Sequence, residues 1–192
     1  MIMKKILFSL LVVFAPLLSF AQSANDTIGL FAVHDGKYEQ MDKIMYRKIK
    51  GSGGLGAALS MGLAKVKAKM EFSKSTSDNV FNGFAHFRFY FGNPPINKIQ
   101  DLFMFSQNYS IKDFDVARFE KKKNSRLLTG ASSSLFGSSV GVASADDLTI
   151  KTKEIRNGVY DVEVSGEPGE YCIIFVGNGA NGFGGVFDFT IK

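Results

Sequence analysis

The amino-acid sequence predicts an all-β fold, an antiparallel β-sandwich, from three observations. Apolar and polar residues alternate along several short segments, as expected for strands with one face in water. Turn-forming residues separate these segments. A sustained helical period is missing, and only residues 96–105 suggest a helical turn. Many short strands joined by turns are typical of a sandwich or a barrel.

The strand pattern can be followed along the chain. The most regular segment is 64–72, where apolar residues occupy the even positions from 66 to 72 and charged residues the odd positions from 65 to 71. In residues 86–91, Phe87, Phe89 and Phe91 share one face. Further strands are expected at residues 28–33, 114–119, 147–155, 158–164, 170–177 and 185–192. Turns are expected at residues 34–37, 157–158 and 168–169, and the tip of a hairpin in the basic run 118–126.

Residues 1–21 predict a secretory signal peptide. Lys4 and Lys5 precede an apolar run, and small residues stand where a signal peptidase cuts, before Gln22. No Cys stands at the cleavage site, so we expect no lipid anchor there. No segment approaches the ~20 apolar residues that a membrane helix needs. We therefore expect residues 22–192 to form a single exported β-sandwich domain, periplasmic or extracellular, without a transmembrane segment.

Charge and cysteine content narrow the expected partners. Without Lys4 and Lys5, the count of Lys and Arg falls from 23 to 21 against 18 acidic residues, which lowers the net charge from +5 to +3. This small excess gives no electrostatic argument for binding nucleic acid. The single Cys172 cannot form an intramolecular disulfide, and its apolar neighbours predict a buried thiol.

Residues Gly51 to Gly56 match the pattern G-x-G-x-x-G, which in dinucleotide-binding folds brings backbone amides close to a pyrophosphate. Such a site also needs a buried strand before the glycines and a helix after them. Here a basic segment precedes the glycines and an alternating strand follows soon after. A second match, at Gly177, Gly179 and Gly182, leads directly into a predicted strand. We interpret both as loops and expect no nucleotide cofactor.

Other reactive residues form no recognisable catalytic or metal-binding pattern. His34 and His86 lack a metal-ligand spacing, so we expect no zinc site. A nucleophilic pair of Cys172 with either histidine is not expected because the thiol lies in an apolar strand. The sequence gives no reason to pair the carboxylates of the last segments, which we interpret as solvated: Asp146, Asp147, Glu167 and Glu170.

Residues 129–147 form a Gly/Ser-rich segment that we interpret as an insertion between strands. Leu135 and Phe136 are the large apolar residues within it. They predict either an anchor that packs the loop on the sandwich or an exposed contact for a partner. Together with residues 51–62, this loop is our expected location for specific contacts.

The C-terminal segments EPGEYCIIFVGN and GVFDFTIK resemble the closing strands of a group of uncharacterised bacterial exported proteins. Chains of that group end in a P-G-E-Y strand, a variable loop and a Y/F-D-F-x-(I/V) strand. The segments DGKYEQM, HFRFYFGNPP and RNGVYDVEV resemble other strands of the group, so the resemblance covers most of the mature chain. It implies a β-sandwich scaffold and carries no activity or ligand. This chain lacks the Pro that often opens the aromatic strand, and its Gly-rich loops differ.

Pro168, Gly169 and Tyr171 also resemble the tyrosine corner of immunoglobulin and fibronectin sandwiches. In that corner a Tyr hydroxyl donates a hydrogen bond to the backbone a few residues upstream. The sequence therefore predicts an immunoglobulin-like sandwich with a structural role for Tyr171.

Two classes of function remain open. The first is a non-catalytic, exported binding or structural module of the cell envelope, which contacts a protein or a glycan through loops or a strand edge. It is favoured because the strands offer a scaffold and no catalytic set is visible. The second is a hydrolase acting on envelope or dietary polysaccharide. Two carboxyl groups in a cleft beside aromatic side chains would favour the hydrolase, and a flat surface would favour binding.

Overall fold

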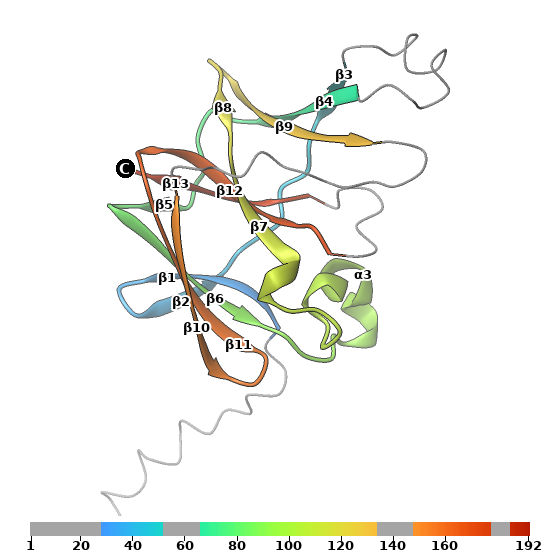
Figure 1. Cartoon of the computed structure of the whole chain (residues 1–192), viewed down its shortest axis with the longest axis vertical. Coiled ribbons are helices and arrows are strands. Elements are labelled where there is room, and N and C mark those ends of the chain that lie inside the picture. The colour runs from blue at the N-terminus through green and yellow to red at the C-terminus, as the bar shows by residue number, and fades with distance from the viewer. Residues whose placement is uncertain (1–27, 52–65, 134–147, 178–184) are drawn as a thin grey trace, which may run out of the picture.

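The computed structural model describes residues 28–51, 66–133, 148–177 and 185–192. Figure 1 shows their strands in three layers. A five-stranded sheet lies at the bottom of the view, a four-stranded central sheet crosses the middle, and a third sheet of four strands lies at the top. Neighbouring strands are antiparallel except in one pair of the central sheet. The predicted all-β, antiparallel sandwich class is confirmed.

Each sheet combines strands that lie far apart in the sequence. The five-stranded sheet has the order β10 (Thr149–Arg156), β11 (Val159–Ser165), β6 (Phe84–Tyr90), β1 (Gly29–His34), β2 (Lys37–Gln40). The central sheet has the order β5 (Val80–Phe81), β13 (Phe187–Ile191), β12 (Gly169–Phe175), β7 (Phe114–Arg118), with β5 parallel to β13. The third sheet has the order β3 (Lys48–Gly51), β4 (Val66–Ser73), β9 (Ser125–Ser133), β8 (Glu120–Lys121).

The central sheet is buried on both faces. All five residues of β13 are buried, and so are six of the seven in β12. On one face Tyr171 and Ile173 enter a large core shared with the five-stranded sheet, which we call the aromatic core. On the other face Cys172 and Ile174 enter a smaller core shared with the third sheet, which we call the second core. The buried thiol predicted for Cys172 is confirmed.

Tight turns join the strands where the sequence predicts them. Between β1 and β2, Asp35 and Gly36 both have positive φ, 50° and 76°. Between β10 and β11, Gly158 has a φ of 73°, and a Cβ at this position would lie 2.9 Å from the carbonyl oxygen of Phe91. Only glycine fits that conformation without strain. The basic run turns from β8 into β9, as the hairpin interpretation predicts.

The helical turn predicted within residues 96–105 is confirmed. Three short elements follow one another: η2 (Ile96–Lys98), α3 (Ile99–Leu102) and η3 (Phe103–Phe105). Met104 and Phe105 are buried and fasten the segment to the sandwich. A further 3-10 turn, η4 (Ile111–Asp113), leads into β7. Within the described residues, no helix has both the length and the apolar character to cross a membrane.

The Gly/Ser-rich segment differs from its prediction in its first part. The interpretation of residues 129–133 as a loop is wrong, because β9 continues to Ser133 and pairs with β4. Backbone pairing accounts for this extension, since small side chains do not prevent a strand whose neighbour supplies hydrogen bonds. Leu135 and Phe136 lie outside the described residues, as do the predicted signal peptide and most of the first G-x-G-x-x-G match.

Candidate functional site

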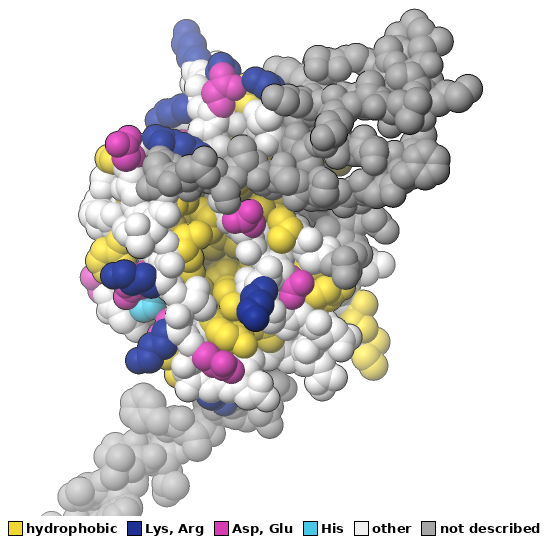
Figure 2. All heavy atoms as spheres, viewed as in Figure 1, with side chains coloured by type: hydrophobic (Ala, Val, Ile, Leu, Met, Phe, Trp, Pro, Cys, Tyr) yellow, Lys and Arg dark blue, Asp and Glu magenta, His cyan; other side chains and the backbone are white. Residues whose placement is uncertain are grey.

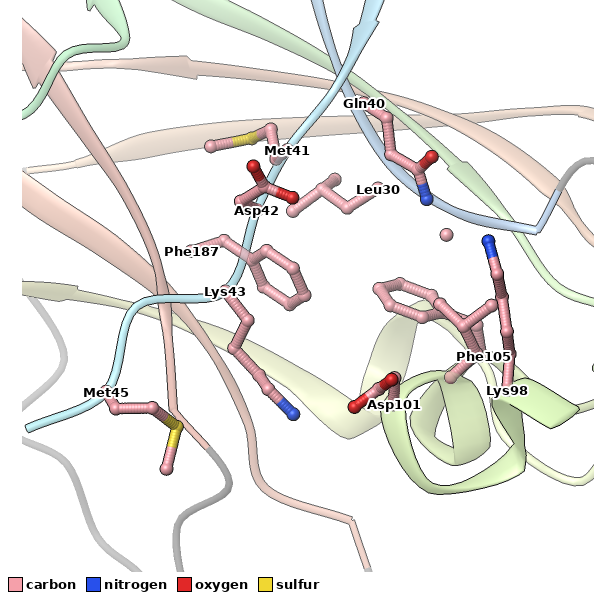
Figure 3. A pocket seen from close by; sticks show the side chains of 12 residues that line it. Leu30, Gln40, Met41, Asp42, Lys43, Met45, Lys98, Asp101, Phe105 and Phe187 are labelled. Carbon is pink, nitrogen blue, oxygen red and sulfur yellow. The ribbon is translucent and has the colours of Figure 1, made fainter.

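A pocket of about 660 Å³ opens beside the helical segment of residues 96–105 (Figure 3). Its floor is apolar and includes Leu30 of β1, Phe105 of η3 and Phe187 of β13. Its rim is polar and combines charges of both signs: Gln40, Asp42, Lys43, Lys98 and Asp101. Ligand sites of proteins commonly occupy ~300–1,000 Å³ and join an apolar lining to a few polar groups, so this pocket has the form of a small-ligand site.

One wall is the segment that follows β2, and β13 holds it in place. Ile44 and Val186 exchange two backbone hydrogen bonds, of 2.8 and 3.0 Å. Gly185, which precedes Val186, has a φ of 100°, and a Cβ there would lie 2.6 Å from the carbonyl oxygen of Ile44 and 2.7 Å from Cγ of Lys43. This close approach sets the position of Lys43 on the rim.

The opposite wall is the helical segment, which is tied to the end of β6. The amide of Gly92 donates to the carbonyl of Phe105 at 2.9 Å, and the amide of Gln107 donates to the carbonyl of Gly92 at 2.9 Å. These bonds and the buried side chain of Phe105 fix the helical turn that carries Lys98 and Asp101. Both walls therefore rest on hydrogen-bonded elements of the sandwich.

The rim can both donate and accept hydrogen bonds. In Figure 3 the ammonium of Lys43 and the carboxylate of Asp101 point toward each other, and Lys98 extends toward the Gln40 amide. Gly29 has a φ of 131°, and a Cβ there would lie 3.2 Å from Nε2 of Gln40, so glycine leaves room for this amide. Carboxylates, ammonium groups and an amide around an apolar floor suit a polyhydroxylated ligand with an apolar face.

A second charged group lies on the outer face of the five-stranded sheet. The guanidinium of Arg88 donates to both oxygens of Asp161, at 2.5 and 2.7 Å, and lies 4.7 Å above the ring of Tyr38. The hydrogen bonds from Arg88 lower the pKa of the Asp161 carboxyl and in turn raise the pKa of Arg88. The Nε2 of His86 is 3.8 Å from the same carboxylate. This arrangement is a bidentate ion pair on a partly exposed sheet face.

The residues of the predicted tyrosine corner lie together at the start of β12. The hydroxyl of Tyr171 donates to the carbonyl oxygen of Glu167 at 2.6 Å, which is the bond that the interpretation predicts. Arg118 lies over the Tyr171 ring at 5.5 Å and donates to the carbonyl of Pro168 at 3.1 Å. A Cβ on Gly169 would lie 3.1 Å from the Arg118 guanidinium, so a small residue suits this contact.

The interpretation of Glu170 as a solvated carboxylate is wrong. Glu170 is 4% exposed and faces the third sheet, where Nη1 of Arg126 lies 3.4 Å from its Oε2. Arg126 also reaches Oδ2 of Asp188 at 2.6 Å. The hydroxyl of Thr190 and the amide of Ser77 donate to Glu170 at 2.9 and 3.0 Å. Burial is tolerated because the charges are paired and hydrogen-bonded. Glu167 is exposed as expected.

The two histidines lie in different surroundings. His34 stacks on Phe81 with ring centroids 4.4 Å apart, and His86 lies beside Asp161. Among the described residues, no group of three or more His, Cys, Asp or Glu side chains could hold a metal ion. Burial raises the pKa of the Cys172 thiol, with a further contribution from the nearby Asp188. Asp146 and Asp147, which the sequence analysis interpreted as solvated, lie outside the described residues.

The pocket residues were not found from the sequence. Asp42 and Lys43 follow an exposed strand, whereas Lys98 and Asp101 belong to a helical turn more than fifty positions later. Charged residues in connections are common on any protein surface, so neither pair suggests a site by itself. The pocket appears only when β13, from the end of the chain, brings the two segments to one place.

The fold and its pocket define a class, an all-β sandwich protein with a polar-rimmed pocket on a hydrogen-bonded scaffold. Comparisons with protein-family models, with curated proteins and with solved structures found no match to this chain. Function is therefore inferred from the chemistry of the site itself.

Proposed function

We propose that the protein is an exported, non-catalytic binding module of the cell envelope, and that its ligand is a glycan held in the pocket of Figure 3. The observation that carries the proposal is the combination of an apolar floor with donors and acceptors from two separate walls. Sugars present apolar C–H faces and many hydroxyl groups, which such a lining can contact together.

The two carboxyl groups whose pKa values are clearly shifted lie away from the pocket. A general acid for glycoside hydrolysis needs a raised pKa. Among the described residues, the carboxyl groups with clearly shifted pKa values are Asp161 and Glu120, and both are lowered by hydrogen bonds to cationic side chains. Neither of them lines the pocket.

A polysaccharide hydrolase is the second candidate. The observation in its favour is that Asp42 and Asp101 line one pocket together with Phe105 and Phe187. A hydrolase would release reducing ends from the glycans that it captures, and Asp42→Asn or Asp101→Asn would abolish the release without abolishing capture. A binding module releases none.

A glycan array tests the binding proposal. The tagged mature chain, Lys98→Glu and Lys123→Glu are compared on the same array. Lys98 lies on the rim and Lys123 lies in the exposed turn of the β8–β9 hairpin, so the two variants carry the same change of charge. We expect Lys98→Glu to lose the captured glycans and Lys123→Glu to keep them. Equal capture by both variants, or none by the wild type, would show that the pocket is not a glycan site.

Export is tested by the mass of the mature chain. The basic start and short apolar run support cleavage before Gln22. Intact-mass measurement of the protein from the periplasm or medium should therefore give the mass of residues 22–192. A full-length mass there, or protein confined to the cytoplasm, would overturn the proposal.

We infer that the five-stranded and central sheets together follow an immunoglobulin-like topology. In that fold strands A, B, E and D form one sheet and strands C, F and G the other. The five-stranded sheet has the strand order A, B, E, D when these letters are given to β1, β6, β11 and β10. Strand β2 is then an additional edge strand beside A. The central sheet has the strand order C, F, G when these letters are given to β7, β12 and β13. Strand β5 is then an additional strand beside G. Strands A to G also follow one another along the chain in alphabetical order.

Two observations support this assignment further. The pair β3–β4 then falls between A and B, and the pair β8–β9 falls between C and D, so the third sheet consists of two insertions. Tyr171 lies near the start of strand F, where the tyrosine corner belongs. Nuclear Overhauser contacts test the topology, because Phe87 of strand B must lie beside both Ala32 and Val162. Loss of either contact would contradict it.

A further inference from the structure

A second, more apolar cleft of about 360 Å³ lies between the edges of two facing sheets. Strand β10 is an edge of the five-stranded sheet, and β7 is an edge of the central sheet. The floor of the cleft includes Phe89, Val162 and Ile173, which belong to the aromatic core. Figure 2 shows hydrophobic side chains at the bottom of a hollow on this side of the molecule, with charged side chains around it. The cleft thus borders the aromatic core, whose side chains at the floor remain buried.

The cleft exists because β10 extends beyond the sheet that faces it. Ile150 and Thr152 pair across the ladder with Val164 and Val162, so they share the face that looks into the core. Both valines are buried, yet Ile150 is 46% exposed. The inward face of β10 is therefore apolar at Ile150 and lacks a covering strand among the described residues.

The edges of the cleft are protected against an added strand. On β7 the carboxylate of Asp115 accepts the amide of Val116 at 2.8 Å, which occupies a donor that a new strand would use. On β10, Lys151 and Lys153 place two charges along the edge, and the ladder is irregular between Glu154 and Arg156. Charges and irregular edges oppose strand pairing. The occupant is therefore not an extended peptide that adds a strand to either edge. What remains for a ligand is the apolar lining of the cleft itself.

We propose that this cleft binds a single hydrocarbon chain that ends in a carboxylate. The lining of the cleft is mainly aliphatic and aromatic side chains, which suits an alkyl chain. Lys112, exposed at the rim, can pair with the carboxylate, whereas Asp115 at the same rim is engaged by a backbone amide. The volume lies near the lower limit of ligand sites, ~300–1,000 Å³, so it fits one chain. This proposal is independent of the glycan pocket.

Decanoate and a fluorescent apolar probe test the site. The mature protein is titrated with 1-anilinonaphthalene-8-sulfonate, and decanoate is then added as a competitor. We expect saturable enhancement of fluorescence that decanoate reverses. Ile150→Asp should weaken both ligands by about tenfold or more, because it places a charge on the apolar wall. Ile155→Asp is the matched control: Ile155 is 44% exposed on the same strand and does not line the cleft.

The head group is tested separately with Lys112→Ala. Loss of the ammonium should weaken decanoate several-fold and leave decan-1-ol unchanged, since only the acid carries a charge. Circular dichroism confirms that the variants are folded, which their exposed positions lead us to expect. The proposal is overturned if decanoate does not compete, if Ile150→Asp and Ile155→Asp bind alike, or if Lys112→Ala weakens acid and alcohol equally.

Discussion

The two faces of the central sheet are packed in different ways. On the side of the five-stranded sheet, the aromatic core joins rings edge to face, as in the contact of Phe87 with Phe189 at 4.9 Å. On the side of the third sheet, the second core is smaller and borders the ionic cluster of Arg126, Glu170 and Asp188. Strands β12 and β7 each supply residues to both cores.

This difference shows how an added layer can be attached to a sandwich. The aromatic core is held by apolar area, which is non-directional. The third sheet offers less apolar surface, and its Arg126 instead reaches two carboxylates of the central sheet. Because buried charges require their partners in a defined geometry, we expect the cluster to specify how the third sheet lies on the central one.

The largest expected effect concerns Cys172, whose side chain lies in the second core. Its thiol is fully buried and its pKa is raised by that burial, so a thiol reagent can react only after the third sheet separates or the chain unfolds. We expect the native reaction to be at least about a thousandfold slower than the reaction in denaturant. Comparable rates in both conditions would show that the third sheet does not cover β12.

Arg126→Met should give the largest loss of equilibrium stability. It leaves Asp188 as a buried carboxylate without its cation and leaves Glu170 with only the exposed Lys121, 3.9 Å away. Removing the buried partner of such an ion pair typically costs about 3–5 kcal/mol. Urea denaturation measures the loss, and adding Glu170→Gln and Asp188→Asn should restore part of it.

The matched control is Lys69→Met, which removes an ion pair of similar length from the same sheet. The Lys69–Glu120 pair is 3.3 Å long, but both side chains are nearly half exposed. We expect no measurable change, because exposed pairs contribute little. If Lys69→Met and Arg126→Met were equally mild, the ionic cluster would not be what attaches the third sheet.

Tyr171→Phe should have an intermediate effect, located at the edge of the aromatic core. The change removes the hydrogen bond from the hydroxyl of the buried Tyr171 to the partly exposed carbonyl of Glu167, at a cost of about 0.5–1.5 kcal/mol. The denaturation midpoint should fall while the denaturant dependence stays the same. An unchanged midpoint would remove the tyrosine corner as a structural element.

The sequence predicted individual strands better than the way they assemble. Alternation located β6 because one of its faces is in the core and the other is not. It could not reveal that β12 is buried on both sides, since an apolar run fits a buried strand in any layer. The solvated interpretation of Glu170 failed for the same reason: its partner Arg126 lies 44 positions earlier, on another sheet.

The candidate site was even less predictable. Apolar floors can be inferred from periodicity, and Leu30 and Phe187 both belong to predicted strands. The polar rim cannot, because Asp42 and Lys98 carry no pattern and meet only through tertiary packing. The two G-x-G-x-x-G matches, which stand out in the sequence, lie mostly outside the described residues.

A small effect that depends on pH is expected at the partly exposed ion pair of Arg88 and Asp161, whose side chains are 19% and 20% exposed. Because the pKa of Asp161 is lower in the folded state than in the unfolded chain, the pair contributes fully above the unfolded pKa of about 3.9. Its contribution is lost as the pH falls through the folded pKa. The stability difference between wild type and Asp161→Asn should therefore be about 1 kcal/mol at pH 7 and shrink toward zero in acid. Urea denaturation at several pH values measures this difference. A difference that grows as the pH falls would mean that the charge of Asp161 opposes folding, and that the outer face of the five-stranded sheet is not stabilised by this pair.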